Sequence, residues 1–161
     1  MEDVKAVGAT ETCDWVAWPQ ANLYLEFALD GGELVSLHLP RRRPAYPQSG
    51  SDVARVLSIY LSGERADFRK VAVRFPDAPA FTKRAWEALR EIPHGEAITY
   101  GELAYQAGNP RAARAAGHAC ATNPVAVVVP CHRVVAVGGL GGYGGDLDAK
   151  RSLLQLEGWL K

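Results

Sequence analysis

The chain is poor in cysteine and contains no long apolar run. Its 161 residues include three cysteines, Cys13, Cys120 and Cys131, and this small odd number argues against a disulfide scaffold and for a reducing compartment. No stretch approaches the roughly 20 apolar residues of a membrane span. The acidic start, residues 1–4, lacks the basic and apolar regions of a signal peptide. We therefore expect a soluble intracellular protein that is long enough to fold without a covalent staple.

Signatures of metal and nucleotide sites are also missing. The three cysteines and four histidines form no C-x₂-C or H-x₃-H pair. A glycine cluster from Gly138 to Gly145 lacks the lysine of a phosphate-binding loop, and glycine there allows positive φ or close approach to a ligand. We expect neither a metal nor another cofactor.

Acidic residues are absent from Leu103 to Gly145, although the whole chain carries 18 basic and 18 acidic residues. Arg111, Arg114 and Arg133 lie in this stretch. The zero net charge of the whole chain gives no sign of nucleic-acid binding. The stretch without acidic residues either marks a basic surface or is a chance feature of a surface of mixed charge. A second basic run, Arg41-Arg42-Arg43 between prolines, predicts an exposed loop that is either solvated or in contact with phosphate.

The first half of the chain has the pattern of a small sheet with a helix. Residues 22–29 and 33–39 alternate between apolar and polar side chains around a Gly-Gly pair, which predicts a β-hairpin. Ser51 is placed to cap a helix that ends at Gly63. A short strand over residues 71–75 is expected to complete the sheet.

A proline-containing segment, residues 76–80, is the best candidate for a domain boundary. After it, apolar residues follow helical spacing from Phe81 to Ile92. We predict an N-terminal α/β domain over residues 1–76 and a mostly helical C-terminal domain over residues 77–161. The expected fold class is therefore α/β, of the α+β kind, with a hairpin-and-helix unit followed by helices.

Two short helices in the second half form a candidate helix-turn-helix. Thr99 and Glu102 match a capping box at the start of the first helix. Asn109 and the proline after it suit the start of a second helix over residues 111–121, which is rich in alanine. The outline fits either a DNA-binding unit or a plain helical hairpin in a core. Small side chains would let the second helix approach a neighbouring surface closely.

A candidate nucleophile follows a β-branched run. Residues 125–129 predict a buried extended strand that leads into Cys131, His132 and Arg133. A thiol becomes a better nucleophile when a base or a cation lies nearby, but a buried structural cysteine gives the same pattern. Asp146 is placed to cap a last helix that runs to Glu157.

Taken together, these motifs resemble the O6-alkylguanine-DNA alkyltransferases, also called methylated-DNA–protein-cysteine methyltransferases. The similarity covers about residues 79–158 and depends on the order and spacing of four motifs. These are Asn123-Pro124, Pro130-Cys131-His132-Arg133-Val134-Val135, the Gly-Gly-Tyr-Gly-Gly stretch 141–145, and Leu153-Leu154 with Glu157-Gly158.

The resemblance implies a role for each of five residues. Cys131 would be the acceptor thiol that attacks the alkyl carbon on guanine O6. His132 would act as a base through a water, oriented by Glu157. Asn123 would brace the turn that holds this network. Tyr100 would donate a proton or a hydrogen bond to guanine N3 as charge develops on the leaving base.

The resemblance also implies a mode of DNA binding. The helix over residues 111–121 would enter the minor groove, and Arg114 would take the place of the flipped nucleotide. The implied DNA contacts are Thr99, Tyr100, Arg111, Ala112, Ala113, Arg114, Gly117 and Arg133. The implied substrate contacts are Val134, Tyr143, Gly144 and Gly145, with Gly144 standing where some relatives carry a serine.

The implied function is direct DNA repair by a single-turnover enzyme. The alkyl group of O6-alkylguanine, and of O4-alkylthymine, would move irreversibly to Cys131. The partner would be double-stranded DNA that contains alkylated guanine, and the protein would be a monomer without a membrane partner. It would work in the cytoplasm, near the nucleoid in a prokaryote, or in the nucleus of a eukaryote.

Three other functions remain open at this stage. One is a non-catalytic protein that recognises alkylated DNA, although such relatives replace the acceptor cysteine. Another is a helix-turn-helix transcription factor, although no dimerisation helix or ligand domain is evident. The third is a hydrolytic Cys-His enzyme, which would turn over repeatedly.

Overall fold

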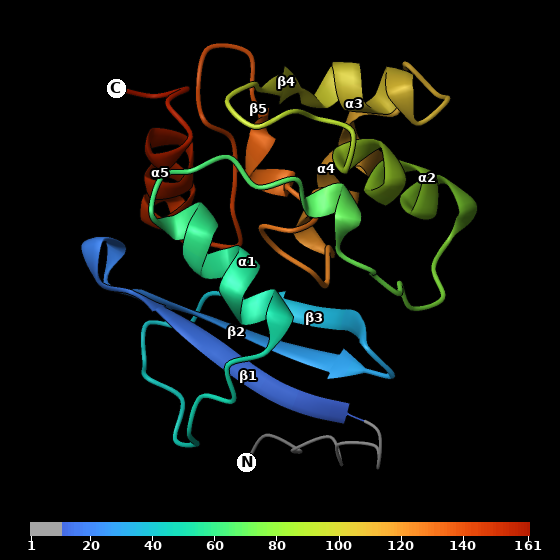
Figure 1. The fold of residues 1–161 in the computed structure, drawn as a ribbon. Coiled ribbons are helices and arrows are strands. Elements are labelled where there is room, and N and C mark those ends of the chain that lie inside the picture. Colours follow the sequence, from blue (N-terminus) through green and yellow to red (C-terminus); the bar gives the residue numbers. More distant parts are fainter. Residues whose placement is uncertain (1–10) are drawn as a thin grey trace.

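A three-stranded antiparallel sheet with one helix against it forms the N-terminal part of the protein (Figure 1). The computed structural model describes residues 11–161. The strands lie in the order β1 (Glu11–Trp18), β2 (Leu23–Asp30) and β3 (Glu33–His38). Helix α1 (Asp52–Leu61) packs against this sheet.

The predicted hairpin is confirmed by the pairing of β2 with β3. The strand expected over residues 71–75 is wrong, because that segment contributes a single bridge between Leu34 and Val73. Strand β1 completes the sheet instead, paired along its length with β2. In β1, residues 14–16 are buried in succession, so the strand lacks the alternation that marks a half-buried strand.

Asp14 of β1 organises the start of α1. Its carboxylate accepts hydrogen bonds from the backbone of Ser49 and from the backbone and hydroxyl of Ser51. Burial would raise the pKa of Asp14, but these bonds together lower it to about 2. Ser51 in turn caps α1 by accepting from the N–H of Ala54 at 3.2 Å, which confirms the predicted cap.

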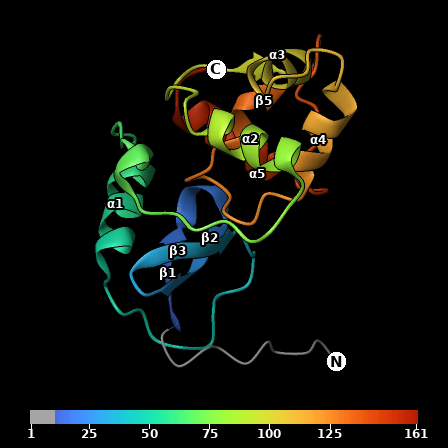
Figure 2. The ribbon, with the colours of Figure 1, turned by 90° about the vertical axis from the view of Figure 1, so that its right-hand side faces the viewer.

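The C-terminal part is mostly helical and lies beside the sheet (Figure 2). Two short strands, β4 (Ile98–Thr99) and β5 (Val134–Val135), pair in parallel between the helices. The 3-10 turn η2 (Phe68–Lys70) lies on the connection from α1. The helices are α2 (Ala80–Leu89), α3 (Tyr100–Gln106), α4 (Ala113–Ala121) and α5 (Leu147–Leu156).

The helix starts follow the local chemistry of the chain. Thr99 accepts from the N–H of Glu102 at the start of α3, and Asp146 accepts from the N–H of Ala149 in α5, as predicted. The predicted start of α4 at residue 111 is wrong by two residues. The side-chain oxygen of Asn109 accepts a hydrogen bond from the N–H of Arg111. The chain therefore makes a turn here before the helix begins.

The strand predicted over residues 125–129 is also wrong. This segment is a buried turn in which Val128 donates to the carbonyl of Ala126 and Val129 donates to that of Val125. Val127 adopts a φ of 71°, an outlier for a β-branched residue that surrounding contacts must enforce. Tertiary context therefore overrides the β propensity of the run.

Backbone hydrogen bonds and a shared core join the two parts of the chain. Leu37 of β3 donates to the carbonyl of Pro124 at 2.9 Å and accepts from the N–H of Ala126 at 3.0 Å. The buried core continues from Phe27 in the sheet to Trp86 in α2. The division near residue 76 stays a prediction.

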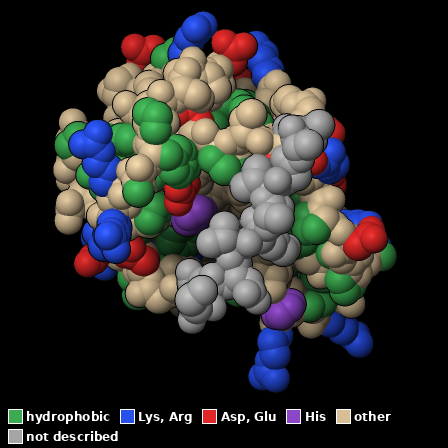
Figure 3. Space-filling view, turned by 90° about the horizontal axis from the view of Figure 1, so that it is seen from below, with side chains coloured by type: hydrophobic (Ala, Val, Ile, Leu, Met, Phe, Trp, Pro, Cys, Tyr) green, Lys and Arg blue, Asp and Glu red, His purple; other side chains and the backbone are tan. Residues whose placement is uncertain are grey.

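The surface seen from below is mixed in charge (Figure 3). Basic and acidic side chains lie at scattered positions among apolar and other atoms on the described part of this face. Within residues 11–161, no helix is both long and apolar enough to cross a membrane.

Candidate active site

Cys131 lies on a short 3-10 turn, η3 (Cys131–Arg133), and not at the end of a strand. Its side chain is 6% exposed and lines a cavity of about 360 Å³. Tyr100 of α3, Asn123 and Tyr143 also line this cavity. The thiol is therefore held at the wall of a space large enough for a small organic group.

A buried network links the next two residues to the end of α5. His132 Nε2 lies 2.8 Å from Oε2 of Glu157. Arg133 donates from Nε to Oε1 of Glu157 at 2.8 Å and from Nη2 to Oε2 at 2.9 Å. The hydroxyl of Tyr60, from α1, donates to the same carboxylate at 2.6 Å. Glu157 thus holds His132 and Arg133 side by side.

This network determines which nitrogen of His132 is free. Burial would raise the pKa of Glu157, but His132 and Arg133 together hold it well below its usual range, so the residue is a carboxylate. A carboxylate only accepts hydrogen bonds, so Nε2 of His132 must carry the proton. Its Nδ1 is buried and has no partner among the described residues. Nδ1 is therefore a lone-pair acceptor.

Cys131 and His132 both rest in their neutral forms. Burial raises the pKa of the Cys131 thiol and lowers the pKa of the His132 imidazole. The rise for Cys131 is opposed by a hydrogen bond from Asn123 and by the nearby charge of Lys150. The pair is suited to passing the thiol proton to His132 at the moment of attack.

Asn123 braces the turn before the cysteine. Its Nδ2 donates to the carbonyl of Val129 at 2.8 Å, and its Oδ1 accepts from the N–H of Val125 at 3.0 Å. These bonds close the buried turn that contains the strained Val127. The geometry supports the bracing role that the resemblance implied.

Lys150 is a functional candidate that was not picked out from the sequence. It is fully buried in α5, and its Nζ donates to the carbonyl of Val134 at 2.6 Å and to that of Gly142 at 3.1 Å. It forms no ion pair with a carboxylate of residues 11–161, and it lies 5.8 Å from the ring centroid of Tyr100. A lysine on the apolar face of a helix was the signal that could have found it.

Tyr100 packs between α4 and the glycine-rich loop. Burial is the main cause that raises the pKa of its hydroxyl, with Cys120 adding to the rise and the backbone N–H of Gly142 opposing it. A Cβ on Gly141 would lie 2.6 Å from the hydroxyl oxygen of Tyr100, and Gly141 has a φ of 76°. The loop can therefore approach Tyr100 only because residue 141 is glycine.

The remaining substrate candidates are only partly brought together. Tyr143 and Gly144 line the cavity, and the buried hydroxyl of Tyr143 has no partner among the described residues. Gly145 is not among the lining residues. The carbonyl of Val134, expected to read guanine, already accepts from Lys150.

The helix α4 and the turn just before it carry five of the eight expected DNA contacts. Arg111, Ala113 and Arg114 are exposed, and Gly117 lines the cavity. Ala112 and Thr99 are half-buried. This arrangement places exposed cations at the open side of a helix whose buried face packs on α2 and α3.

The DNA contact expected for Arg133 is corrected by the structure. Its side chain is buried, and its guanidinium is occupied by Glu157 and by the carbonyl of Ile92. A buried guanidinium bound in this way cannot reach a phosphate. Arg133 instead lowers the pKa of Glu157 and so helps to keep it ionised.

The N-terminal part also contributes to the cavity, which the sequence did not indicate. His38, the last residue of β3, and Leu39 line it together with residues of α4 and the glycine-rich loop. Arg41, from the basic run, donates to Asp146 at 2.7 Å and so joins this part to the start of α5. The cavity is therefore lined by both parts of the chain.

The fold and the site define a class of protein. A buried thiol beside a His–Glu pair is an arrangement for nucleophilic cysteine chemistry. It lies next to two short helices in the outline of a helix-turn-helix. The class is therefore that of a cysteine nucleophile carried on a candidate DNA-binding unit.

Comparison with known proteins identifies the family. Residues 80–159 match the family model described as 6-O-methylguanine DNA methyltransferase, DNA binding domain. A methylated-DNA–protein-cysteine methyltransferase of Methanosarcina acetivorans is 49% identical over 109 residues, which cover 66% of this chain and 68% of the relative. One of Mycolicibacterium paratuberculosis is 46% identical over 113 residues, covering 69% and 67%. The chain belongs to the O6-methylguanine DNA methyltransferase family.

Solved structures extend the similarity to the N-terminal part. The O6-methylguanine methyltransferase of Mycobacterium tuberculosis superposes with a TM-score of 0.79 and 36% identity, covering 91% of this chain and 92% of that one. The same relative in complex with DNA gives a TM-score of 0.76 and 34% identity over the same shares of the two chains. The mixed α/β fold that we predicted is thereby confirmed.

Proposed function

We infer that this protein repairs DNA by moving the alkyl group of O6-alkylguanine to its own Cys131, once per molecule. The observation that carries this function is the buried Cys131 thiol at a cavity, next to a His132 whose Nδ1 is free and whose Nε2 is bound to Glu157. Family membership supplies the substrate class. O4-alkylthymine presents a similar alkyl–oxygen bond and is a second substrate within the proposal.

The transfer balances with the chain's own groups. The thiol proton passes through a water molecule to Nδ1 of His132, which has no direct partner among the described residues, and the imidazolium is stabilised by Glu157. The sulfur forms a bond to the alkyl carbon as the carbon–O6 bond breaks, and the electron pair moves onto the base. Tyr100 donates its hydroxyl proton to N3 of the leaving guanine, and the proton held by His132 then returns to Tyr100 through solvent, so that the thiol hydrogen ends on the base.

The transfer ends in a thioether, which explains the single turnover. No group of the site can displace the alkyl carbon from sulfur again, because a thioether sulfur is a poor leaving group for the weak nucleophiles present. The protein is therefore consumed in stoichiometric amounts. We place this reaction in the cytoplasm against nucleoid DNA, or in the nucleus if the source is a eukaryote.

DNA binding would use the outer side of α4. Its alanines and Gly117 allow close approach to a minor groove, while Arg114 is exposed on the helix and Arg111 is exposed in the turn before it. Arg114 would fill the space left by the flipped nucleotide, and Tyr100 lies at the cavity that receives the base. The relative from M. tuberculosis has been solved in complex with DNA, which is consistent with a duplex partner.

Stoichiometry tests this function. Excess duplex DNA with a labelled O6-methylguanine should transfer one label per protein molecule and then stop. Continued release of label into solution would favour a hydrolytic enzyme. Tight binding of the lesion with no transfer would favour a non-catalytic lesion-binding protein.

A further inference from the structure

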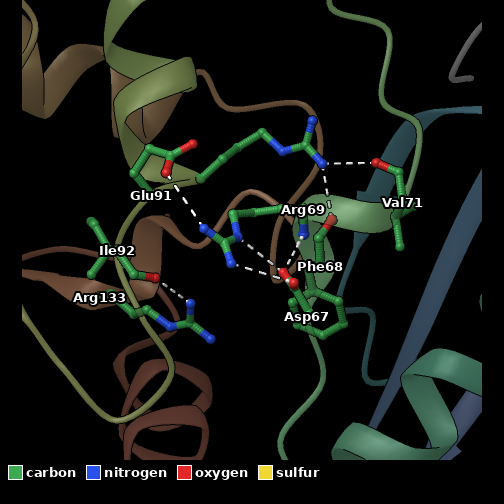
Figure 4. Close-up of polar contacts among 8 residues, drawn as sticks. Asp67, Phe68, Arg69, Val71, Glu91, Ile92 and Arg133 are labelled. Carbon is green, nitrogen blue, oxygen red and sulfur yellow. Dashed lines mark hydrogen bonds and ion pairs between the residues drawn. The ribbon is translucent and has the colours of Figure 1, made fainter.

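A second cavity, of about 330 Å³, lies where the connection from α1 meets the end of α2. It shares no lining residue with the Cys131 cavity. Its walls come from residues 65–69 around η2, from residues 90–94 after α2, and from Val128, Pro130 and Arg133. Figure 4 shows this region, in which η2 lies opposite the end of α2.

The lining of this cavity is rich in positive charge. It contains four arginines, Arg65, Arg69, Arg90 and Arg133, and two carboxylates. Both carboxylates, Asp67 and Glu91, approach Arg69, at 3.1 Å and 3.8 Å (Figure 4). Arg133 is neutralised from behind by Glu157. The charges of Arg65 and Arg90 are left without a carboxylate among the described residues.

Arg90 is held firmly but not neutralised. Its Nη2 donates to the carbonyl of Phe68 at 2.9 Å and to that of Val71 at 2.7 Å. Its Nε is buried and has no partner in residues 11–161. Two carbonyl dipoles orient this guanidinium through Nη2, and its Nη1 has no hydrogen-bond partner in residues 11–161, on a side chain that lines the cavity.

His94 adds a second unpartnered nitrogen to the same lining. Its Nδ1 is buried with no partner in the described structure. The guanidinium of Arg65 lies near it, because a Cβ on the adjacent Gly95 would be 3.8 Å from Arg65 Nη2.

We propose that this cavity binds a small oxyanion of the phosphate class, either inorganic phosphate or the terminal phosphate of a small phosphomonoester. Arg65 and Arg90 would supply both the charge and the hydrogen bonds, from the N–H groups of their guanidinium groups that have no partner among the described residues. Water could accept these hydrogen bonds but carries no negative charge to pair with the two guanidinium groups. A tetrahedral oxyanion does both.

Binding would stabilise the folded protein at a junction important for the active site. The ligand would bridge the segment of η2 to the end of α2, where the carbonyl of Ile92 receives Arg133. A ligand that binds only the folded state raises the unfolding temperature in a saturable way. We expect ligand binding to stabilise the active-site network without changing the rate of alkyl transfer.

Thermal unfolding in inorganic phosphate tests the proposal, with chloride at matched ionic strength as the reference. The exposed Arg65→Ala is the informative variant, and Arg55→Ala, an exposed change on α1, is its matched control. We expect wild type and Arg55→Ala to show the same saturable rise in Tm. Arg65→Ala should need at least tenfold more phosphate for half of that rise.

A second control separates this site from DNA phosphate contacts. Arg114→Ala, on α4, should leave the phosphate response unchanged. No saturable rise in wild type, an equal response in Arg65→Ala, or loss of the response in Arg114→Ala would each overturn the proposal. A parallel titration with deoxyguanosine monophosphate distinguishes the sources, since a tighter response to it would assign the site to a phosphomonoester, and an equal or weaker one to free phosphate. Transfer from free O6-benzylguanine should be unchanged in Arg65→Ala, so this test is independent of the repair function.

Discussion

At the scale of single residues, Cys131 depends on a nearby base and not on a low thiol pKa. Burial raises the pKa of the thiol and lowers the pKa of His132, so the neutral pair is the resting state. A raised pKa keeps the thiol protonated, which protects it from non-specific oxidation and alkylation because the thiolate is the reactive form. Reactivity then appears only when a substrate occupies the cavity and the proton can move to Nδ1.

Removing His132 should therefore change the pH dependence of transfer. His132→Ala should slow transfer from free O6-benzylguanine at neutral pH by about 10²- to 10⁴-fold, which is the rate enhancement that a positioned general base usually provides. The residual rate should rise about tenfold per pH unit, because below its raised pKa the thiol gives tenfold more thiolate for each unit.

The wild-type rate should be much flatter over the same range, since neutral His132 persists above its lowered pKa. Rates measured by mass spectrometry between pH 6 and 9 would check this. Equal slopes for the two proteins would show that His132 does not take the thiol proton.

Among the elements, the glycine-rich loop between β5 and α5 determines how Tyr100 is held. Gly141 lies against the Tyr100 hydroxyl with a positive φ, whereas a Cβ on Gly139 would meet nothing within 4 Å. Gly141→Ala should push Tyr100 or the loop away and slow transfer by about an order of magnitude or more, because a 1 Å misplacement costs up to about 10²-fold.

Gly139→Ala, in the same loop without positive φ, is the matched control and should keep nearly the full rate. Both rates would be measured with free O6-benzylguanine, and the Tm of each variant would show that the fold is intact. Equal rates for the two variants would mean that contact with Tyr100 is unimportant.

On helix α4, the exposed Arg114 has only small neighbours, residues 112–113 and 115–116. Flipping a guanine out of a duplex costs a few kcal/mol, and a side chain that fills the vacancy recovers part of that cost. Arg114→Ala should slow repair of duplex DNA by about tenfold or more but leave transfer from free O6-benzylguanine nearly unchanged.

The control for Arg114 is Arg111→Ala, a neighbouring exposed cation. If Arg111 contacts a phosphate, its loss should reduce the salt slope of binding by about one and leave the rate at saturation intact. Slowing of Arg114→Ala on both substrates, or a mere change in its salt slope, would argue against the role in base flipping.

For the molecule as a whole, local signals in the sequence predicted the elements that local chemistry controls. The hairpin of β2 and β3, the Ser51 cap of α1 and the Asp146 cap of α5 depend on residues close together in the chain. Strand β1 was missed because residues 14–16 are buried in succession, so its sequence lacks the alternation of a half-buried strand. The turn at residues 125–129 was predicted as a strand because long-range packing there overrides propensity.

The site was predictable to the extent that it lies in motifs. Cys131 and His132 stood out as a candidate nucleophile and its neighbour, the resemblance added Glu157, and the structure joins His132 to Glu157 beside Cys131. Tyr60 reaches Glu157 from a helix 97 residues away, which no spacing rule could reveal. Arg133 was assigned to DNA because the sequence does not show that its guanidinium is bound to the carboxylate of Glu157.

The central claim is that Cys131 is the acceptor of the alkyl group. Incubation with duplex DNA containing O6-methylguanine, followed by intact-mass and peptide-mass analysis, tests it most directly. The account predicts a gain of about 14 Da, one methyl group, on the peptide that contains Cys131, and no gain in Cys131→Ala, which should still bind the lesion because binding and chemistry are separable. A gain that maps to Cys13 or Cys120, or no gain in the wild-type protein, would contradict it.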